Sequence, residues 1–124
     1  MNKICTSIEQ SKKLMELGID VKTADMWWNF YSVTTDDTTP QIIHLDTPWV
    51  GSFNWANKPD NIPAWSLAAL LEVLNFPSLI QEKENQWEVC VFDHDNDGYI
   101  EKTASNSVDA CYEMIIKLHE LKML

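Results

Sequence analysis

The sequence predicts an α+β fold in which three helices pack on a mainly antiparallel sheet. Three segments repeat apolar residues at helical spacing behind capping residues, and the runs between them are rich in β-branched and aromatic residues bounded by turns. At 124 residues, the chain is predicted to form a single domain over residues 1–124. A domain of this length buries about two thirds of the surface that its unfolded chain exposes.

The three predicted helices span residues 7–17, 64–75 and 107–121. In the first, Ser7 and Gln10 have the spacing of a capping box, and Gly18 has the place of a left-handed C-terminal residue. In the second, Pro63 suits the first helical position and the leucines from Leu67 onward follow one helical stripe. In the third, Ser107 is the predicted N-cap.

Two hairpins are predicted between the helices. The segments "MWWNFYSVTT" and "QIIHL" flank the turn "DDTTP", and "QWEVCVF" and "YIEKTA" form a second hairpin across residues 87–103. A long connection over residues 47–63 separates them, with a short strand expected at "GSFNW".

The stretch "FDHDNDGYIE" in the second hairpin allows two interpretations. An EF-hand is excluded, because position 12 of such a loop falls on Ala104 and the preceding segment reads as a strand. The stretch resembles the shorter, strand-flanked calcium loops of some β-propeller blades, with four carboxylate ligands: Asp93, Asp95, Asp97 and Glu101. The alternative, which we favour, is a solvated two-residue turn at Asp97 and Gly98, in which substitution of Gly98 would be damaging.

The charge of the chain restricts its partners. The chain has nineteen acidic residues, nine lysines and no arginine, and its net charge is −10. The electrostatic field of a chain with this charge repels polyanions, so nucleic acid is not an expected partner. The simplest interpretation of the charge is that it keeps the protein soluble, and the more specific one is that the protein binds a basic protein partner. The sequence shows neither a secretory signal nor a stretch of the ~20 apolar residues that span a bilayer, which predicts a cytoplasmic protein without a membrane partner.

Cysteines and tryptophans complete the candidate residues. Cys5, Cys90 and Cys111 lack paired spacing, so we expect buried, reduced thiols and no disulfide framework or metal knuckle. Three of the six tryptophans lie in strand-like runs and are expected in the core. The other three lie in or beside the long connection and form a candidate partner or ligand surface: Trp49, Trp55 and Trp65. No local signature joins a histidine or cysteine into a catalytic group, so neither an enzyme nor a cofactor is expected.

Three segments together resemble a family of short, uncharacterised proteins of gut bacteria and their phage-like or mobile elements. They are "TSIEQSKKLMELGID" with the following "TADM", then "PAWSLAALLEVL", and "SVDACYEMIIKLHEL", about half of the chain. The resemblance implies an origin but supplies no activity, cofactor or catalytic residue. The leading hypothesis is a non-enzymatic, acidic protein-interaction module, such as an accessory or anti-defence factor of a mobile element. The alternative is a small-molecule or sugar-binding domain, with or without calcium in the 93–101 loop. The oligomeric state stays open.

Overall fold

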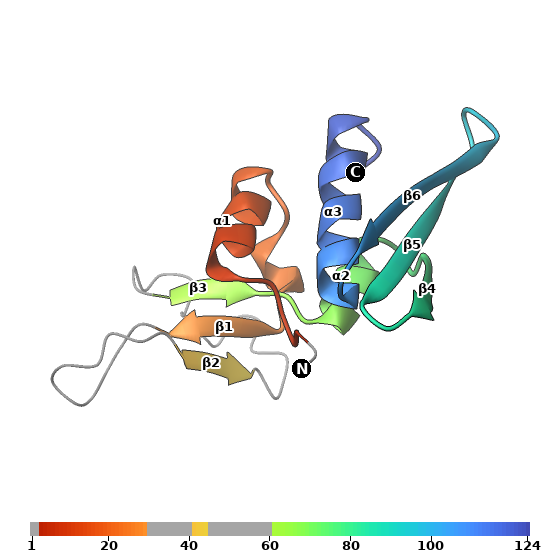
Figure 1. Cartoon of the computed structure of the whole chain (residues 1–124). Helices are drawn as coiled ribbons and strands as arrows, with labels where there is room; N and C mark the ends of the chain where they lie inside the picture. Colours follow the sequence, from red (N-terminus) through yellow and green to blue (C-terminus); the bar gives the residue numbers. More distant parts are fainter. Residues whose placement is uncertain (1–2, 30–40, 45–60) are drawn as a thin grey trace, which may run out of the picture.

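The computed structural model describes residues 3–29, 41–44 and 61–124, and in these residues the predicted α+β fold is confirmed (Figure 1). The strands form two three-stranded antiparallel sheets, where the sequence had predicted one sheet. The elements in chain order are α1 (Ile8–Glu16), the 3₁₀ helix η1 (Val21–Thr23), β1 (Met26–Asn29), β2 (Gln41–His44), β3 (Asn61–Ala64), α2 (Leu67–Val73), β4 (Ser78–Lys83), β5 (Gln86–Asp93), β6 (Gly98–Ala104) and α3 (Ser107–Glu120).

The helices form where local capping allows them. The Ser7 hydroxyl accepts a hydrogen bond from the Gln10 N–H at 3.1 Å, and the Gln10 side chain accepts one from the Ser7 N–H at 2.9 Å, which confirms the capping box. After α1, Gly18 has a φ of 89°, and the Ile19 N–H bonds to the Leu14 carbonyl at 3.0 Å. These are the features of a glycine-terminated helix.

Two predicted caps are wrong. Pro63 lies in β3 and not at the start of α2, because the helix begins after Ser66, whose hydroxyl accepts a hydrogen bond from the Ala69 N–H. At α3 the N-cap is Asn106, one residue before the predicted Ser107, and its side chain accepts a hydrogen bond from the Asp109 N–H at 2.8 Å. Both helices still lie within the predicted ranges.

The first sheet has the strand order β2-β1-β3. Trp27 of β1 pairs with Ile43 of β2, so the predicted antiparallel pairing of these two segments is confirmed. On the other side Trp27 pairs with Pro63 of β3, a strand that the sequence had not predicted. β3 is an edge strand, where a proline is tolerated since one side of the strand needs no ladder hydrogen bond. The expected strand at "GSFNW" lies outside the described residues.

The second sheet has the strand order β4-β5-β6. β5 and β6 form the predicted hairpin, paired without interruption from Trp87 opposite Ala104 to Asp93 opposite Gly98. β4 was not predicted. It pairs with β5, and its register shifts between Gln81 and Lys83.

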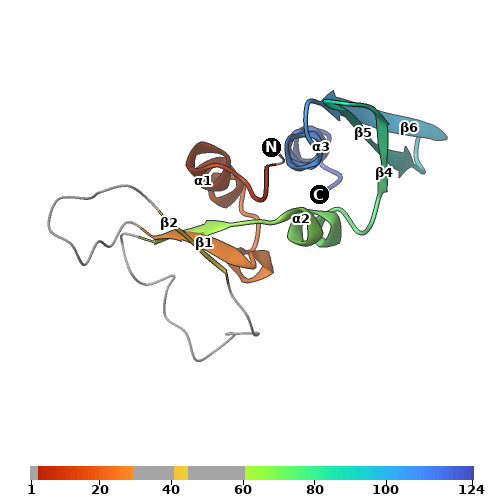
Figure 2. The same cartoon turned by 60° about the horizontal axis from the view of Figure 1, so that its bottom comes forward.

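Helix α3 lies at the centre of the main core. In Figure 2 it is seen end-on, with the second sheet on one side and α1 and α2 on the other. Its buried side chains pack together with Val89 of β5, Leu70 of α2 and Leu14 of α1. The helix contributes six buried residues: Val108, Ala110, Cys111, Met114, Ile115 and Leu118.

Buried hydrogen bonds join the segment before α1 to this core. Thr6 is fully buried, its N–H donates to the Trp65 carbonyl at 2.9 Å, and its hydroxyl accepts from the Trp65 N–H at 3.1 Å. The same hydroxyl lies 2.8 Å from that of Ser11. The segment before α1 is therefore fixed against the end of β3.

An ion pair and a hydrogen bond also join the N-terminal part of the chain to the start of α3. The Asp109 carboxylate accepts hydrogen bonds from Lys3 at 2.7 Å and from the Gln10 side chain at 2.8 Å. Burial by itself would raise the pKa of Asp109, but the hydrogen bonds from Lys3, Gln10 and Asn106 outweigh it and hold the pKa below its ordinary value.

Candidate functional site

The second sheet has one face packed on α3 and an opposite face that no helix or strand of the described residues covers (Figure 2). We call the uncovered face the outer face. Trp87, Val89 and Val91 of β5 belong to the core, so the residues that alternate with them point outward. The outer face carries three carboxylates, one thiol and three apolar side chains: Glu82, Glu88, Glu101, Cys90, Ile80, Phe92 and Tyr99.

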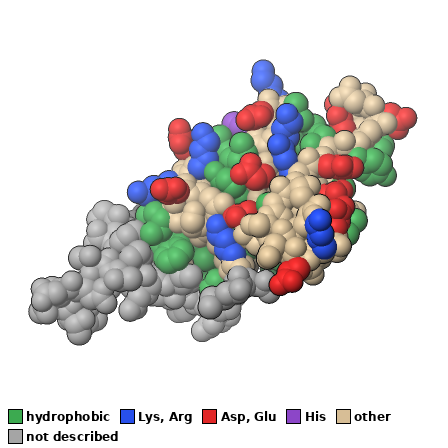
Figure 3. Space-filling view, viewed as in Figure 1, with side chains coloured by type: hydrophobic (Ala, Val, Ile, Leu, Met, Phe, Trp, Pro, Cys, Tyr) green, Lys and Arg blue, Asp and Glu red, His purple; other side chains and the backbone are tan. Residues whose placement is uncertain are grey.

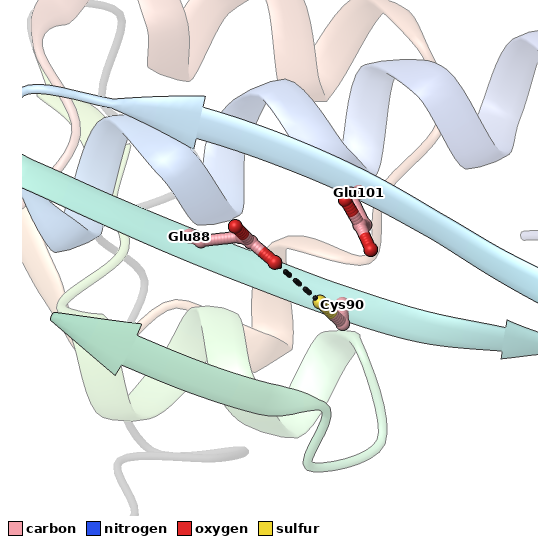
Figure 4. A group of neighbouring side chains, drawn as sticks. All are labelled: Glu88, Cys90 and Glu101. Atoms are coloured by element: carbon pink, nitrogen blue, oxygen red, sulfur yellow. Dashed lines mark hydrogen bonds between the residues drawn. The ribbon is translucent and has the colours of Figure 1, made fainter. Parts of the chain in front are cut away.

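A thiol and two carboxylates meet at the middle of the outer face. Cys90 of β5 is directly opposite Glu101 of β6, and Glu88 precedes Cys90 by two residues. The ends of the three side chains converge on the same side of the strands (Figure 4), with their ligand atoms within 4.8 Å of one another. The Cys90 thiol donates a hydrogen bond to a Glu88 carboxylate oxygen at 3.0 Å.

Glu82 of β4 adds a third carboxylate to this group. A hydrogen bond with Glu88, together with the charges of Glu88 and Glu101, raises the pKa of Glu82 above its ordinary value. The pKa of Glu88 is lowered by the hydrogen bond that the Cys90 thiol donates to its carboxylate and then by a hydrogen bond with Glu82. Across residues 3–29, 41–44 and 61–124 the one ion pair is that of Lys3 with Asp109, so no described lysine pairs with these carboxylates. Among the described residues, the outer face thus concentrates negative charge that no ion pair neutralises, although the charge of Lys83 at the end of β4 acts on Glu82.

Cys90 is not the buried core thiol that the sequence predicted. It is half-buried on the outer face, whereas Cys5 and Cys111 are buried as expected, and all three are free thiols. Burial raises the pKa of the Cys90 thiol to about 12, and the hydrogen bond to Glu88 and the nearby carboxylate charges act in the same direction. The thiol is therefore protonated at neutral pH, and a protonated thiol is a poor nucleophile.

The same group has donor atoms that a metal ion can use. Zinc accepts thiolate and carboxylate ligands, and Glu88, Cys90 and Glu101 would provide one thiolate and two carboxylates. Such an ion would have to displace the proton of a thiol whose pKa is about 12. The donor set alone therefore does not make this group a metal site.

Aromatic side chains extend the outer face toward the tip of the hairpin. The rings of Phe92 and Tyr99 lie opposite each other on β5 and β6 and meet edge to face, with their centroids 5.2 Å apart. The His94 ring makes a similar contact with Phe92 at 4.6 Å. Tyr99 is 70% exposed, and Ile80 of β4 is 50% exposed. Figure 3 shows red acidic and green hydrophobic side chains side by side over this part of the molecule.

The tip of the hairpin is a hydrogen-bonded turn. One oxygen of the buried Asp93 carboxylate accepts from the Asp95 N–H at 3.1 Å and from the Asn96 N–H at 3.4 Å, and the other accepts from the Asn96 side chain at 2.7 Å. The Asn96 side chain, and then the two backbone N–H groups, lower the pKa of Asp93. This is the local pattern by which an aspartate stabilises a turn.

The predicted two-residue turn is wrong in detail. Four residues separate the paired Asp93 and Gly98, and the positive φ, 51°, belongs to Asp97 and not to Gly98. A Cβ atom added to Gly98 would meet only the Asn96 carbonyl oxygen, at 3.9 Å. The expectation that a substitution of Gly98 would be damaging is therefore wrong.

The four predicted calcium ligands divide between two places. Asp93, Asp95 and Asp97 lie in or beside the turn, whereas Glu101 lies with Glu88 and Cys90 on the outer face. In the part of the chain that the structure describes, Glu88, Cys90 and Glu101 form the one group of three such side chains that is close enough to share an ion. The structure therefore does not gather the predicted ligands, and calcium binding stays a prediction.

The predicted tryptophan surface is wrong for Trp65. This residue is fully buried, and its ring N–H donates a hydrogen bond to the Thr23 hydroxyl at 2.8 Å. Trp49 and Trp55 lie outside the described residues.

The outer face was not predicted from the sequence. The alternation of side chains in "QWEVCVF" was nevertheless a signal that Glu88 and Cys90 point away from the core.

Comparison of the chain with models of known protein families, with curated proteins and with solved structures gives no match. Among the described helices, none has the length and apolar character needed to cross a membrane.

Proposed function

We propose that the protein is a non-enzymatic interaction module whose outer face binds a basic segment of another protein. The observation that carries the proposal is the combination of three carboxylates that form no ion pair with a described residue and exposed aromatic rings on a sheet face that no described element covers. Contiguous exposed apolar side chains bordered by polar residues are typical of protein interaction sites.

The rings would supply most of the affinity. Covering an exposed aromatic side chain is worth about 1.5–3 kcal/mol, whereas an exposed ion pair contributes only about 0.2–1 kcal/mol. Phe92 and Tyr99 already contact each other, so a partner that covers them restricts few additional rotations. Tyrosine is also one of the residue types enriched at binding hot spots.

The carboxylates would select a basic partner. A hydrogen bond with Glu88, and then repulsion from the negative charges of Glu88 and Glu101, raise the pKa of Glu82. A lysine or arginine side chain placed among them relieves this repulsion, and the net charge of −10 draws such a partner from a distance. An acidic partner or a nucleic acid meets repulsion at the same place.

A peptide-display selection tests the proposal. A random peptide library is selected for binding to the full chain, with a variant carrying Glu82→Gln, Glu88→Gln and Glu101→Gln as the counter-selection. We expect the recovered peptides to combine lysine or arginine with apolar residues. Recovery of no peptide that distinguishes the two proteins, or of peptides without basic residues, would overturn the proposed function.

A further inference from the structure

We infer that the basic partner binds as an added strand along the free edge of β6. The inference rests on the proposed function and specifies how the partner is recognised. In the described part of the chain, β6 pairs only with β5, so its other edge presents backbone N–H and C=O groups without strand partners. Addition of an extended peptide to such an edge is a recurring mode of recognition, in which the main chain supplies hydrogen bonds and alternate side chains supply specificity.

Of the two edges of this sheet, β6 is the better template. The register of β4 on β5 shifts between Gln81 and Lys83, and irregularities of this kind hinder the pairing of another strand. β6, by contrast, pairs with β5 residue for residue over its whole length of seven residues, so its edge is regular.

The side chains along β6 define a pattern for the partner. Tyr99, Glu101 and Thr103 alternate on the outer face, while Ile100 and Lys102 lie on the side of α3. Side chains directly opposite each other on neighbouring antiparallel strands lie ~4.5–5.5 Å apart. A basic residue opposite Glu101 and an apolar residue two positions along, opposite Tyr99, therefore fit the outer face.

The residues between these two positions would face the other way, on the side of Lys102. A basic residue there would meet a like charge, so neutral residues fit better. The preferred partner has basic and apolar residues in alternation with neutral ones. A second copy of the chain fits poorly, since it brings its own Glu101 and a net charge of −10 to the same edge.

Hydrogen exchange measured by NMR tests strand addition. The probe is a synthetic peptide of repeating Lys-Thr-Val-Thr units, and the control is the same peptide with N-methylated backbone amides, which cannot donate strand hydrogen bonds. With the probe at saturation, we expect the β6 amides that point away from β5 to exchange more slowly, by at least about tenfold. We expect the control peptide to leave their exchange unchanged.

The outcomes separate this inference from the function on which it rests. Binding of the probe without slower exchange at the β6 edge would show docking on the face alone, which overturns strand addition and leaves the proposed function standing. Failure of the probe to bind also overturns strand addition by a peptide with this alternation of basic and apolar residues. The proposed function is then still tested independently by the library selection. Edge amides that are already protected in the free protein, together with a dimeric mass by light scattering, would show that a second copy occupies the edge, which also overturns the inference.

Discussion

Replacing Thr6 by valine should destabilise the protein strongly although it preserves the shape of the side chain. Thr6 is fully buried, and its hydroxyl meets both the Trp65 N–H at 3.1 Å and the Ser11 hydroxyl at 2.8 Å. Valine removes this hydroxyl and leaves two buried polar groups without their partner, each at a cost of about 1–3 kcal/mol. The Ser11 hydroxyl can turn to a backbone carbonyl of its own helix, which places the total at about 2–4 kcal/mol. For a chain of this length, such a loss lowers the melting temperature by on the order of 10 °C.

Urea unfolding followed by tryptophan fluorescence measures this loss, and Ser11→Ala is the matched control. In that variant the Thr6 hydroxyl still accepts the hydrogen bond from the Trp65 N–H, so we expect a loss of only about 1 kcal/mol. The double variant should be no less stable than Thr6→Val alone, because the Ser11 hydroxyl that it also removes has already lost its hydrogen bond with residue 6. A stability of Thr6→Val within about 0.5 kcal/mol of the wild type, or additive losses in the double variant, would refute the reasoning.

Three further predictions concern single residues. In urea unfolding, Gly98→Ala should stabilise the chain by about 0.4–1 kcal/mol. Gly18 has a φ of 89°, so Gly18→Ala should destabilise the chain by about 1–2 kcal/mol. Equal effects of the two substitutions would contradict the assigned backbone angles. Since the pKa of Cys90 is about 12 against an ordinary 9.0, iodoacetamide should alkylate it about 30-fold more slowly than a free thiol, and peptide mapping that shows an ordinary rate would refute this. The lowered pKa of Asp109 stabilises the folded chain above the unfolded carboxyl pKa of about 3.9, and this contribution disappears as the pH falls through the folded value. Asp109→Asn should therefore cost about 1–2 kcal/mol at pH 7 and progressively less below pH ~4, and a pH-independent cost in acid unfolding would contradict the linkage.

The elements that sequence could predict are those whose signals are local. The capping box of Ser7 with Gln10 and the glycine at position 18 define α1 within a few residues of the chain, and the apolar stripe does the same for α3. The hairpin of β5 and β6 was found because runs of apolar and β-branched residues flank an acidic turn.

The missed strands depend on contacts that are distant in the sequence. β3 contains Pro63 and looks like the end of a connection, and it becomes a strand only through its pairing with β1. β4 is almost entirely exposed, so it has no alternation of apolar and polar residues to reveal it. Its existence depends on the pairing with β5.

The candidate site lies between these two cases. That Glu88 and Cys90 point outward follows from the period of β5 alone, and the error was to treat Cys90 as part of an apolar run. The meeting of Cys90 with Glu101 required the register of the hairpin, in which four residues form the turn and not two. The approach of Glu82 required β4, which the sequence did not show.

A titration with matched charge variants tests the central claim most directly. The peptides recovered by selection are titrated at low salt into the wild type, into the outer-face triple variant, and into a control carrying Glu9→Gln, Glu16→Gln and Glu113→Gln. The control removes an equal number of negative charges, at exposed positions on α1 and α3. If the outer face is the binding surface, the outer-face variant loses at least about tenfold in affinity while the control stays within about threefold of the wild type. Equal losses in both variants would show that only the overall charge attracts the peptides, and would contradict the assignment of function to the outer face.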